Sequence, residues 1–268
     1  MPPELKRKMG RLVTGQGFRQ ILEGELLTGP EKAIAIVEVA EKNGVTLRLM
    51  GGLAVAFHCH LAHAEHMRSC HDIDLFGLRK ESEGIQLVFR NLGYSADKEF
   101  NALNGTERLR FRDNQNRDVD VFLDKFRMEH VIDFRARLHL DNFTIPLTDL
   151  FLTKVQNVKL AAKDVSDIIS LLEDHTIGDN DDQEVVNLRY IEELCADDWG
   201  LWRSVTGNLS KVSELVNQGD YEAIDKAQVL SKLESIRNAI DSREKTFRWK
   251  LRARVGEKVQ WYFDVEEA

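Results

Sequence analysis

Two short segments of the sequence set paired aspartates between apolar residues, and this alternation restricts the fold more than any other feature. Residues 72–75 read Asp-Ile-Asp-Leu, and residues 118–121 read Asp-Val-Asp-Val. Because successive side chains of a strand point to opposite faces, each segment presents two carboxylates on one face and two apolar side chains on the other. Aspartate is depleted in strands, so packing alone does not explain two such segments. Carboxylates on one sheet face repel one another unless a cation lies between them, and the pattern therefore predicts a cation-binding sheet face.

A glycine pair, Gly51-Gly52, precedes the first aspartate segment. Residues 45–50 predict a short apolar strand that runs into this pair, and residues 53–64 predict a helix after it. A tight turn between a strand and a helix exposes backbone N–H groups that suit a phosphate. Metal-binding carboxylates and a phosphate cradle together indicate nucleotide chemistry.

This order of elements resembles the nucleotidyltransferase superfamily named after DNA polymerase beta. The family pattern is a Gly-Gly or Gly-Ser turn, a helix, an Asp-x-Asp strand and a third Asp on a later strand. The sequence is most similar to the abortive-infection and minimal nucleotidyltransferase branches, where an Arg-x-Thr-x-Asp-hydrophobic-Asp order is usual. Here Cys70 stands where Thr is common, and Gly52 stands where many relatives carry a phosphate-binding Ser. The resemblance covers Thr46 to Leu172 and fades beyond them.

The resemblance implies a site for two Mg²⁺ ions, with Asp72 and Asp74 as ligands and Asp120 as the third carboxylate. All three candidates are hard oxygen ligands, which Mg²⁺ prefers. In such sites the two ions lie about 3.5–4 Å apart. Asp118 competes with Asp120 for the third position. We favour Asp120 because apolar residues flank it on both sides, deeper in the strand.

Further residues are candidates for contact with a nucleoside triphosphate. Besides the backbone of the glycine pair, Arg68 lies four residues before the first aspartate, where contact with the triphosphate and an ion pair with a carboxylate are equally good interpretations. By the resemblance, Lys154 stabilises phosphate charge, and Asp164 or Asp167 orders the helical half against the sheet. A surface ion pair between Lys163 and Asp167, one helical turn apart, is the simpler interpretation of the latter segment.

Residues 58–71 are rich in histidine and also contain Cys59 and Cys70. The five histidines are His58, His60, His63, His66 and His71. A zinc site is one interpretation, but the segment has no Cys-x-x-Cys or His-Glu-x-x-His spacing. We therefore favour histidines on the surface or at the rim of an active site.

Composition limits the class of protein. The chain has 268 residues, of which 43% are hydrophobic, and this supports one large or two modest folded domains. A net charge of −8 argues against a nucleic-acid-binding surface over the whole molecule. The three cysteines are too few for a disulfide framework and fit a reducing compartment. The basic N-terminal residues are not followed by an apolar core, and no apolar run approaches the ~20 residues that a membrane helix needs. We therefore expect no signal peptide, and a cytoplasmic protein without membrane contact.

The pattern predicts an α/β (α+β) fold, in which a small mixed β-sheet with flanking helices is followed by a helical domain. We expect an N-terminal arm over residues 1–30, the nucleotidyltransferase-like core over 31–147 and the helical domain over 148–268. The main elements expected within these domains are helices at 31–42, 82–92, 150–160, 163–173 and 223–243, a hairpin of strands 107–112 and 117–123, and a further strand at 142–146. Thr148 and Asp149 are candidate N-caps. Residues 245–258 interleave basic and aromatic side chains, as nucleic-acid-binding segments and solvated helices both do.

The sequence thus predicts metal-dependent transfer of a nucleotidyl group from a nucleoside triphosphate to an acceptor that is RNA, protein or a small molecule. One alternative is a catalytically silent binding module with the same fold. A second is the toxin of a toxin–antitoxin pair, which uses the same chemistry and has an antitoxin-like protein partner. A third is a zinc-binding structural protein. The sequence does not choose among ATP, GTP, CTP and UTP.

Overall fold

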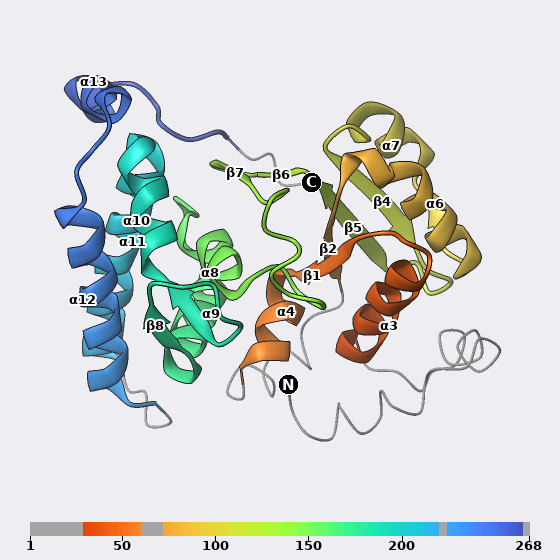
Figure 1. The fold of residues 1–268 in the computed structure, drawn as a ribbon, viewed down its shortest axis with the longest axis horizontal. Coiled ribbons are helices and arrows are strands. Elements are labelled where there is room, and N and C mark those ends of the chain that lie inside the picture. The colour runs from red at the N-terminus through yellow and green to blue at the C-terminus, as the bar shows by residue number, and fades with distance from the viewer. Residues whose placement is uncertain (1–28, 60–71, 220–223, 265–268) are drawn as a thin grey trace. The chain divides into compact units, whose positions relative to one another are not determined.

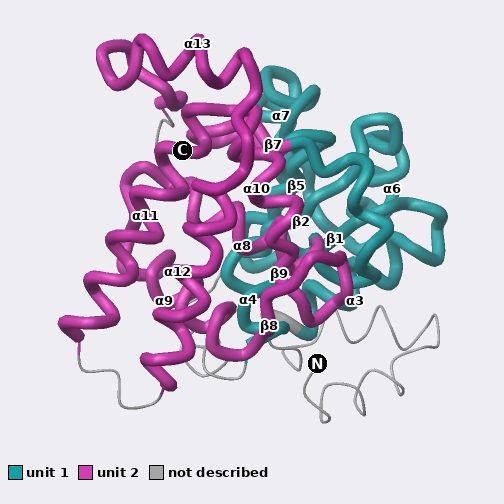
Figure 2. Tube along the Cα trace, turned by 60° about the vertical axis from the view of Figure 1, so that its left-hand side comes forward, with its two compact units in different colours: residues 1–125, 133–145 teal, residues 126–132, 146–268 magenta. Residues whose placement is uncertain are grey.

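The computed structural model describes residues 29–59, 72–219 and 224–264, which form two compact units (Figures 1 and 2). Within these ranges, unit 1 comprises residues 29–59, 72–125 and 133–145, and unit 2 comprises residues 126–132, 146–219 and 224–264. The fold is mixed α/β, with a mixed five-stranded sheet, helices beside it and further helices after it, as the sequence predicts.

The described part of unit 1 contains one five-stranded sheet in the order β1-β2-β5-β4-β3. Its strands are β1 (Leu47–Met50), β2 (Ile73–Gly77), β3 (Ser95–Ala96), β4 (Arg108–Arg112) and β5 (Asp118–Leu123). The central pair β2 and β5 is parallel, and the other three pairs are antiparallel. The β4–β5 hairpin confirms the prediction. Its turn is held by Asp113, which accepts hydrogen bonds from the backbone of Gln115 and Arg117.

The helices of unit 1 confirm most of the predicted boundaries. They are α3 (Gly29–Lys42), α4 (Gly51–His58), α6 (Ser82–Asn91) and α7 (Lys98–Asn104), with a 3₁₀ turn at Arg79–Glu81. Gly44, with φ of +70°, follows the end of α3. The expected helix over residues 53–64 is wrong at Cys59, which is extended with φ of −108° and ψ of 133°. The remainder of that prediction lies outside the described residues.

One face of the sheet is apolar and is covered by α6. In the strand register, Leu75 lies between Leu49 and Val121. Phe89 of α6 stacks on Phe111 of β4, with ring centroids 4.1 Å apart. A Cβ atom at Gly77 would lie only 3.0 Å from Ile85 of α6, so the helix packs directly on β2. This layer is the hydrophobic core of unit 1.

The segment after β5 covers part of the opposite, polar face. Arg48 is buried, and its Nε donates to the backbone carbonyls of Leu138 at 2.9 Å and Asp141 at 2.6 Å. The strand expected at residues 142–146 is reduced to an isolated parallel bridge between Leu49 and Thr144. Arg48 therefore anchors this segment beside the edge strand β1.

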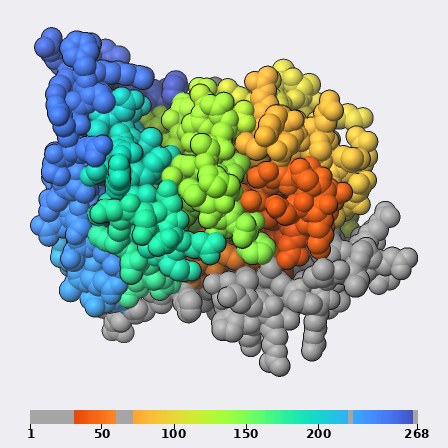
Figure 3. All heavy atoms as spheres, in the orientation of Figure 1, coloured from red at the N-terminus to blue at the C-terminus, as the bar shows by residue number. Residues whose placement is uncertain are grey.

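Unit 2 is mainly helical, and the atoms of its helices are the green to blue spheres of Figure 3. Its helices are α8 (Leu147–Val155), α9 (Ala162–Asp174), α10 (Leu188–Asp197), α11 (Trp199–Gln218), α12 (Lys226–Ser242) and α13 (Phe247–Val255), with a 3₁₀ turn at Gly256–Lys258. Its strands β8 (Thr176–Gly178) and β9 (Val185–Asn187) are parallel. The strands β6 (Lys125–Arg127) and β7 (Val131–Asp133) pair where the chain passes from one unit to the other.

The structure corrects three expectations for unit 2. Thr148 and Asp149 are not N-caps, because α8 begins at Leu147 and both side chains are buried inside its first turn. The Thr148 hydroxyl instead accepts a hydrogen bond of 2.8 Å from the backbone N–H of Asn187. The same helix ends at Val155 and not at Leu160. The helix expected at residues 223–243 is α12, which begins only at Lys226 and ends at Ser242.

A buried histidine makes the stability of unit 2 depend on pH. A ring nitrogen of His130 lies 2.8 Å from the Ser204 hydroxyl, and burial lowers the pKa of this imidazole while the Asp198 carboxylate opposes the shift. As the pH falls below 6.5, the unfolded chain binds a proton that the folded chain resists. The free energy of unfolding should therefore fall between about pH 7.5 and about pH 5.5.

Urea unfolding of wild type, His130→Gln and His139→Gln at both pH values tests this prediction. His139 is exposed and serves as the control. We expect the pH dependence to be smaller in His130→Gln and unchanged in His139→Gln. Equal slopes in all three proteins would contradict the assignment.

Candidate functional site

The aspartates predicted from the sequence lie on the polar face of the sheet in unit 1. The parallel register of β2 and β5 pairs Asp74 with Asp120. Asp72 directly precedes β2 and is exposed, whereas Asp120 is only 8% exposed. Two of the three predicted carboxylates are therefore direct neighbours on adjacent strands, and the third stands where the chain enters β2.

The row that contains these neighbours continues across the sheet. Met50 of β1 is the partner of Asp74 in the register, and Arg110 of β4 is the partner of Asp120. The next row pairs Arg48, Phe76, Phe122 and Arg108. Each row is set by the alternation of strand side chains, which turns every second residue to this face.

Gly51 brings the backbone against the first of these carboxylates. It lies at the start of α4 with φ of +71°, in the left-handed region that favours glycine. A Cβ atom built on Gly51 would lie 2.4 Å from Oδ2 of Asp74. The glycine thus meets two independent constraints, its backbone conformation and the space that Asp74 occupies. The contact of Gly51 and Gly52 with a phosphate remains a prediction.

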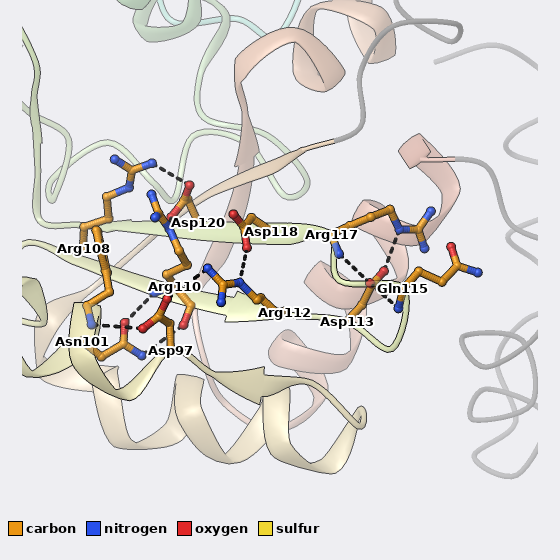
Figure 4. Close-up of polar contacts among 11 residues, drawn as sticks. Asp97, Asn101, Arg108, Arg110, Arg112, Asp113, Gln115, Arg117, Asp118 and Asp120 are labelled. Atoms are coloured by element: carbon orange, nitrogen blue, oxygen red, sulfur yellow. Dashed lines mark hydrogen bonds and ion pairs between the residues drawn. The ribbon is translucent and has the colours of Figure 1, made fainter. Parts of the chain in front are cut away.

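Asp120 is held by two arginines of β4 (Figure 4). Arg108 Nη2 lies 2.5 Å from Oδ2 of Asp120, and Arg110 Nε lies 3.0 Å from Oδ1. The guanidinium of Arg110 also stacks over the ring of Phe100, 4.2 Å from its centroid. Both oxygens of this carboxylate therefore already accept charge-assisted hydrogen bonds.

Asp118, the competing third carboxylate, has a different environment. It lies nearer the start of β5, its side chain is 37% exposed, and its Oδ1 accepts a hydrogen bond of 2.8 Å from Arg112. This hydrogen bond raises the pKa of Arg112, which also pairs with Asp97 at 3.3 Å. Asp120 is the deeper of the two and the one beside Asp74, which agrees with the reasons for preferring it.

Sequence reasoning missed the three arginines. Residues 108–112 read Arg-Leu-Arg-Phe-Arg, and this alternation has the same period as the aspartate segments. In a hairpin with β5, it directs Arg108, Arg110 and Arg112 to the face that carries the carboxylates. The signal was therefore present in the sequence, as a basic strand adjacent to an acidic one.

The donor set suits a hard divalent cation only in part. Asp72 and Asp74 offer oxygens of the type that Mg²⁺ binds. Asp72 lies directly before β2, and Asp74 lies within it. No group of three His, Cys, Asp or Glu side chains in the described ranges is arranged to hold a metal ion. Both oxygens of Asp120 are engaged by arginines, and its role as a third ligand remains a prediction. The two Mg²⁺ ions thus remain a prediction.

Lys154 belongs to a buried charged cluster in unit 2. Its Nζ lies 2.7 Å from Oδ2 of Asp167 and 3.9 Å from Oδ1 of Asp164, and all three side chains are nearly buried. The cluster links α8 to α9. Asp167 thus pairs with Lys154, whereas the simpler sequence interpretation paired it with Lys163, which is exposed. A role of Lys154 at phosphate remains a prediction.

Several candidates from the sequence lie outside the described residues. These are Arg68, Cys70, His60, His63, His66 and His71. Of the described members of that segment, His58 lies 2.8 Å from the Thr144 hydroxyl, and Cys59 is buried. The zinc interpretation therefore stays open.

The chain matches no protein-family model, and a search of curated proteins finds no similar sequence. Among the described helices, none combines the length and apolar character needed to cross a bilayer. Functional conclusions for this protein accordingly depend on the geometry of its own residues.

Substitution of Gly51 tests its fit against Asp74. Gly44 is a matched control, because its φ of +70° is nearly the same and no described atom lies within 4 Å of an added Cβ. We expect Gly44→Ala to lower the free energy of unfolding by about 1–2 kcal/mol, the cost of the left-handed conformation. Gly51→Ala should lower the free energy of unfolding by more than Gly44→Ala does, because it also displaces the Asp74 carboxylate.

The double variant Gly51→Ala/Asp74→Ala separates the two causes. Measured by urea unfolding against the single variant Asp74→Ala, the glycine substitution should lose most of its extra cost and lower the free energy of unfolding about as much as Gly44→Ala does. Additive losses in the double variant would show that the contact with Asp74 is not the cause.

The Lys154 cluster gives a further stability prediction. Lys154→Met leaves two buried carboxylates without their cation and should lower the free energy of unfolding by about 3–5 kcal/mol. Lys163→Met, at an exposed position on the same pair of helices, should change it by less than about 0.5 kcal/mol. Chemical unfolding measures both, and similar small effects would argue against a structural role for the ion pair.

Proposed function

We propose that this protein is a metal-dependent nucleotidyltransferase that moves a nucleoside monophosphate from a nucleoside triphosphate to an acceptor. The observation that carries the proposal is the register of β2 and β5, in which Asp74 and Asp120 are direct neighbours beside Asp72. Apolar packing does not explain two adjacent carboxylates on parallel strands, because aspartate is unfavourable in strands. The Gly51 turn, which meets Asp74 directly, supports the same interpretation.

In this reaction the acceptor oxygen bonds to the α-phosphorus, and the bond from that phosphorus to the bridging oxygen breaks to release pyrophosphate. Asp72 and Asp74 would hold the divalent cation, with Asp120 as the third carboxylate. Bound Mg²⁺ would supply positive charge to the triphosphate and lower the pKa of the attacking hydroxyl. The carboxylates would orient the cation. The proton of the acceptor hydroxyl would pass to solvent or to a carboxylate that is not a ligand of the cation.

The second candidate is a nucleotide-binding module without catalysis. It is favoured by one observation, the occupation of both Asp120 oxygens by Arg108 and Arg110. If these ion pairs persist when nucleotide binds, Asp120 is not a metal ligand. An acceptor, and an antitoxin-like protein partner, are expected only for the first candidate.

Labelling with nucleotides distinguishes the two candidates. The purified protein is incubated with each α-labelled nucleoside triphosphate, Mg²⁺ and a cell extract, and the labelled macromolecule or small molecule is identified. We expect Asp74→Asn to lower transfer by about a hundredfold or more, because a carboxylate that orients charge in the transition state is lost. Asp118→Asn should retain partial activity, since Asp118 is less buried than Asp120 and pairs with Arg112.

Thermal unfolding should show that both variants remain folded. Wild-type activity in Asp74→Asn at saturating Mg²⁺ would reject the carboxylate assignment. Absence of label with all four nucleotides, combined with nucleotide binding, would favour the silent module.

A further inference from the structure

Arg108 and Arg110 form a cationic pair with more hydrogen-bonding capacity than Asp120 uses. A guanidinium has five N–H donors in a planar fork. Arg108 reaches Asp120 through Nη2, and Arg110 reaches it through Nε. The buried Nε of Arg108 has no hydrogen-bond partner among the described residues. An unpaired buried donor is costly, so its presence indicates a missing acceptor at this position.

Aromatic rings fix the orientation of both guanidiniums. Arg108 lies over Phe122, 4.7 Å from the ring centroid, and over Phe100 at 5.6 Å. Arg110 lies over the same Phe100 ring at 4.2 Å. Stacked guanidiniums of low exposure lose little freedom when a ligand binds, which favours binding. The pair is therefore prepared to bind an anion with a forked set of oxygens.

We propose that Arg108 and Arg110 form a binding site for the phosphate groups of a nucleoside triphosphate, which the Asp120 carboxylate fills when no nucleotide is bound. This inference rests on the proposed function for the identity of the ligand. Phosphate oxygens match the guanidinium fork as well as carboxylate oxygens do and carry more charge. The orphan Nε–H of Arg108 gives the phosphate a donor that Asp120 does not use.

Exchange of one anion for the other links nucleotide binding to the carboxylate row. When phosphate takes the arginines, Asp120 is released beside Asp74, its direct neighbour in the register. The third carboxylate then becomes free to bind a cation only after the nucleotide has arrived. Arg112 takes no part, because Asp118 and Asp97 hold it at a different position on β4.

Binding of inorganic tripolyphosphate without divalent metal tests the site directly. Isothermal titration calorimetry in a chelating buffer compares wild type with Asp120→Asn, which removes the internal competitor. We expect Asp120→Asn to bind tripolyphosphate about tenfold more tightly, the effect of about one charge-assisted hydrogen bond. Asp118→Asn removes the same charge two residues away and should change the affinity by less than about twofold, because it frees only Arg112.

The arginines are tested in the Asp120→Asn background, where no buried carboxylate is left without its cations. Arg108→Gln/Arg110→Gln in this background should lower the affinity about tenfold or more, whereas Arg112→Gln should not. Thermal unfolding of each variant verifies that it is folded. Equal affinity of wild type and Asp120→Asn would overturn the proposal, as would an equal gain in Asp118→Asn, which would indicate a general charge effect.

The same experiment separates this proposal from the proposed function. Tight binding of tripolyphosphate to the arginine pair, with no nucleotidyl transfer in the labelling assay, would reject catalysis and keep the site. If transfer depends on Asp74 but Asp120→Asn has no effect on tripolyphosphate binding, the proposed enzymatic function stands and the phosphate site at the arginines is rejected.

Discussion

The parallel pairing of β2 with β5 is the constraint on which the rest of unit 1 depends. One register sets Leu75 against Val121 on the apolar face and Asp74 against Asp120 on the polar face. A slip of one residue would turn the aspartates into the layer that α6 covers and expose the apolar side chains. The burial of the apolar face therefore fixes the positions of the carboxylates, although the two sets of side chains never meet.

The polar face is close to charge balance without any bound cation. Asp118 and Asp120 of β5 face three arginines of the neighbouring strand β4, and each has at least one guanidinium within hydrogen-bonding distance. Carboxylates gathered on one face need a cation, and for two of these aspartates that cation is an arginine of the protein. A metal ion would therefore have to compete with arginine for Asp120.

The elements that sequence reasoning predicted well are those with strong local signals. Alternation identified β2, β4 and β5, and the predicted end of α3 at Lys42 is confirmed. The failures depend on tertiary contacts that no local pattern reveals. Thr148 has the chemistry of an N-cap, yet its hydroxyl binds the backbone of Asn187, 39 positions further along the chain. The helix α4 stops at His58, although the sequence around it carries no helix-breaking residue.

The candidate site divides in the same way. The identity of its carboxylates followed from each strand alone, because the period of a strand fixes which side chains share a face. Their partners required strand order, since Arg110 meets Asp120 only because β4 lies beside β5. An acidic strand and a basic strand with the same period are predictable separately. That they are neighbours depends on the hairpin turn at Asp113, which is a local signal of a different kind.

Neutralisation by arginine also changes what a carboxylate-to-amide substitution should do to this face. If the aspartates repelled one another without compensation, removing any one of them would relieve strain. Asp120 instead balances two guanidiniums that lie over aromatic rings. Loss of its charge leaves two nearby cations facing each other, which is costly until another anion arrives. The two arginine charges that make Asp120 important for the fold without ligand therefore also favour the binding of phosphate. Stability and phosphate binding at this face both depend on how these two charges are neutralised.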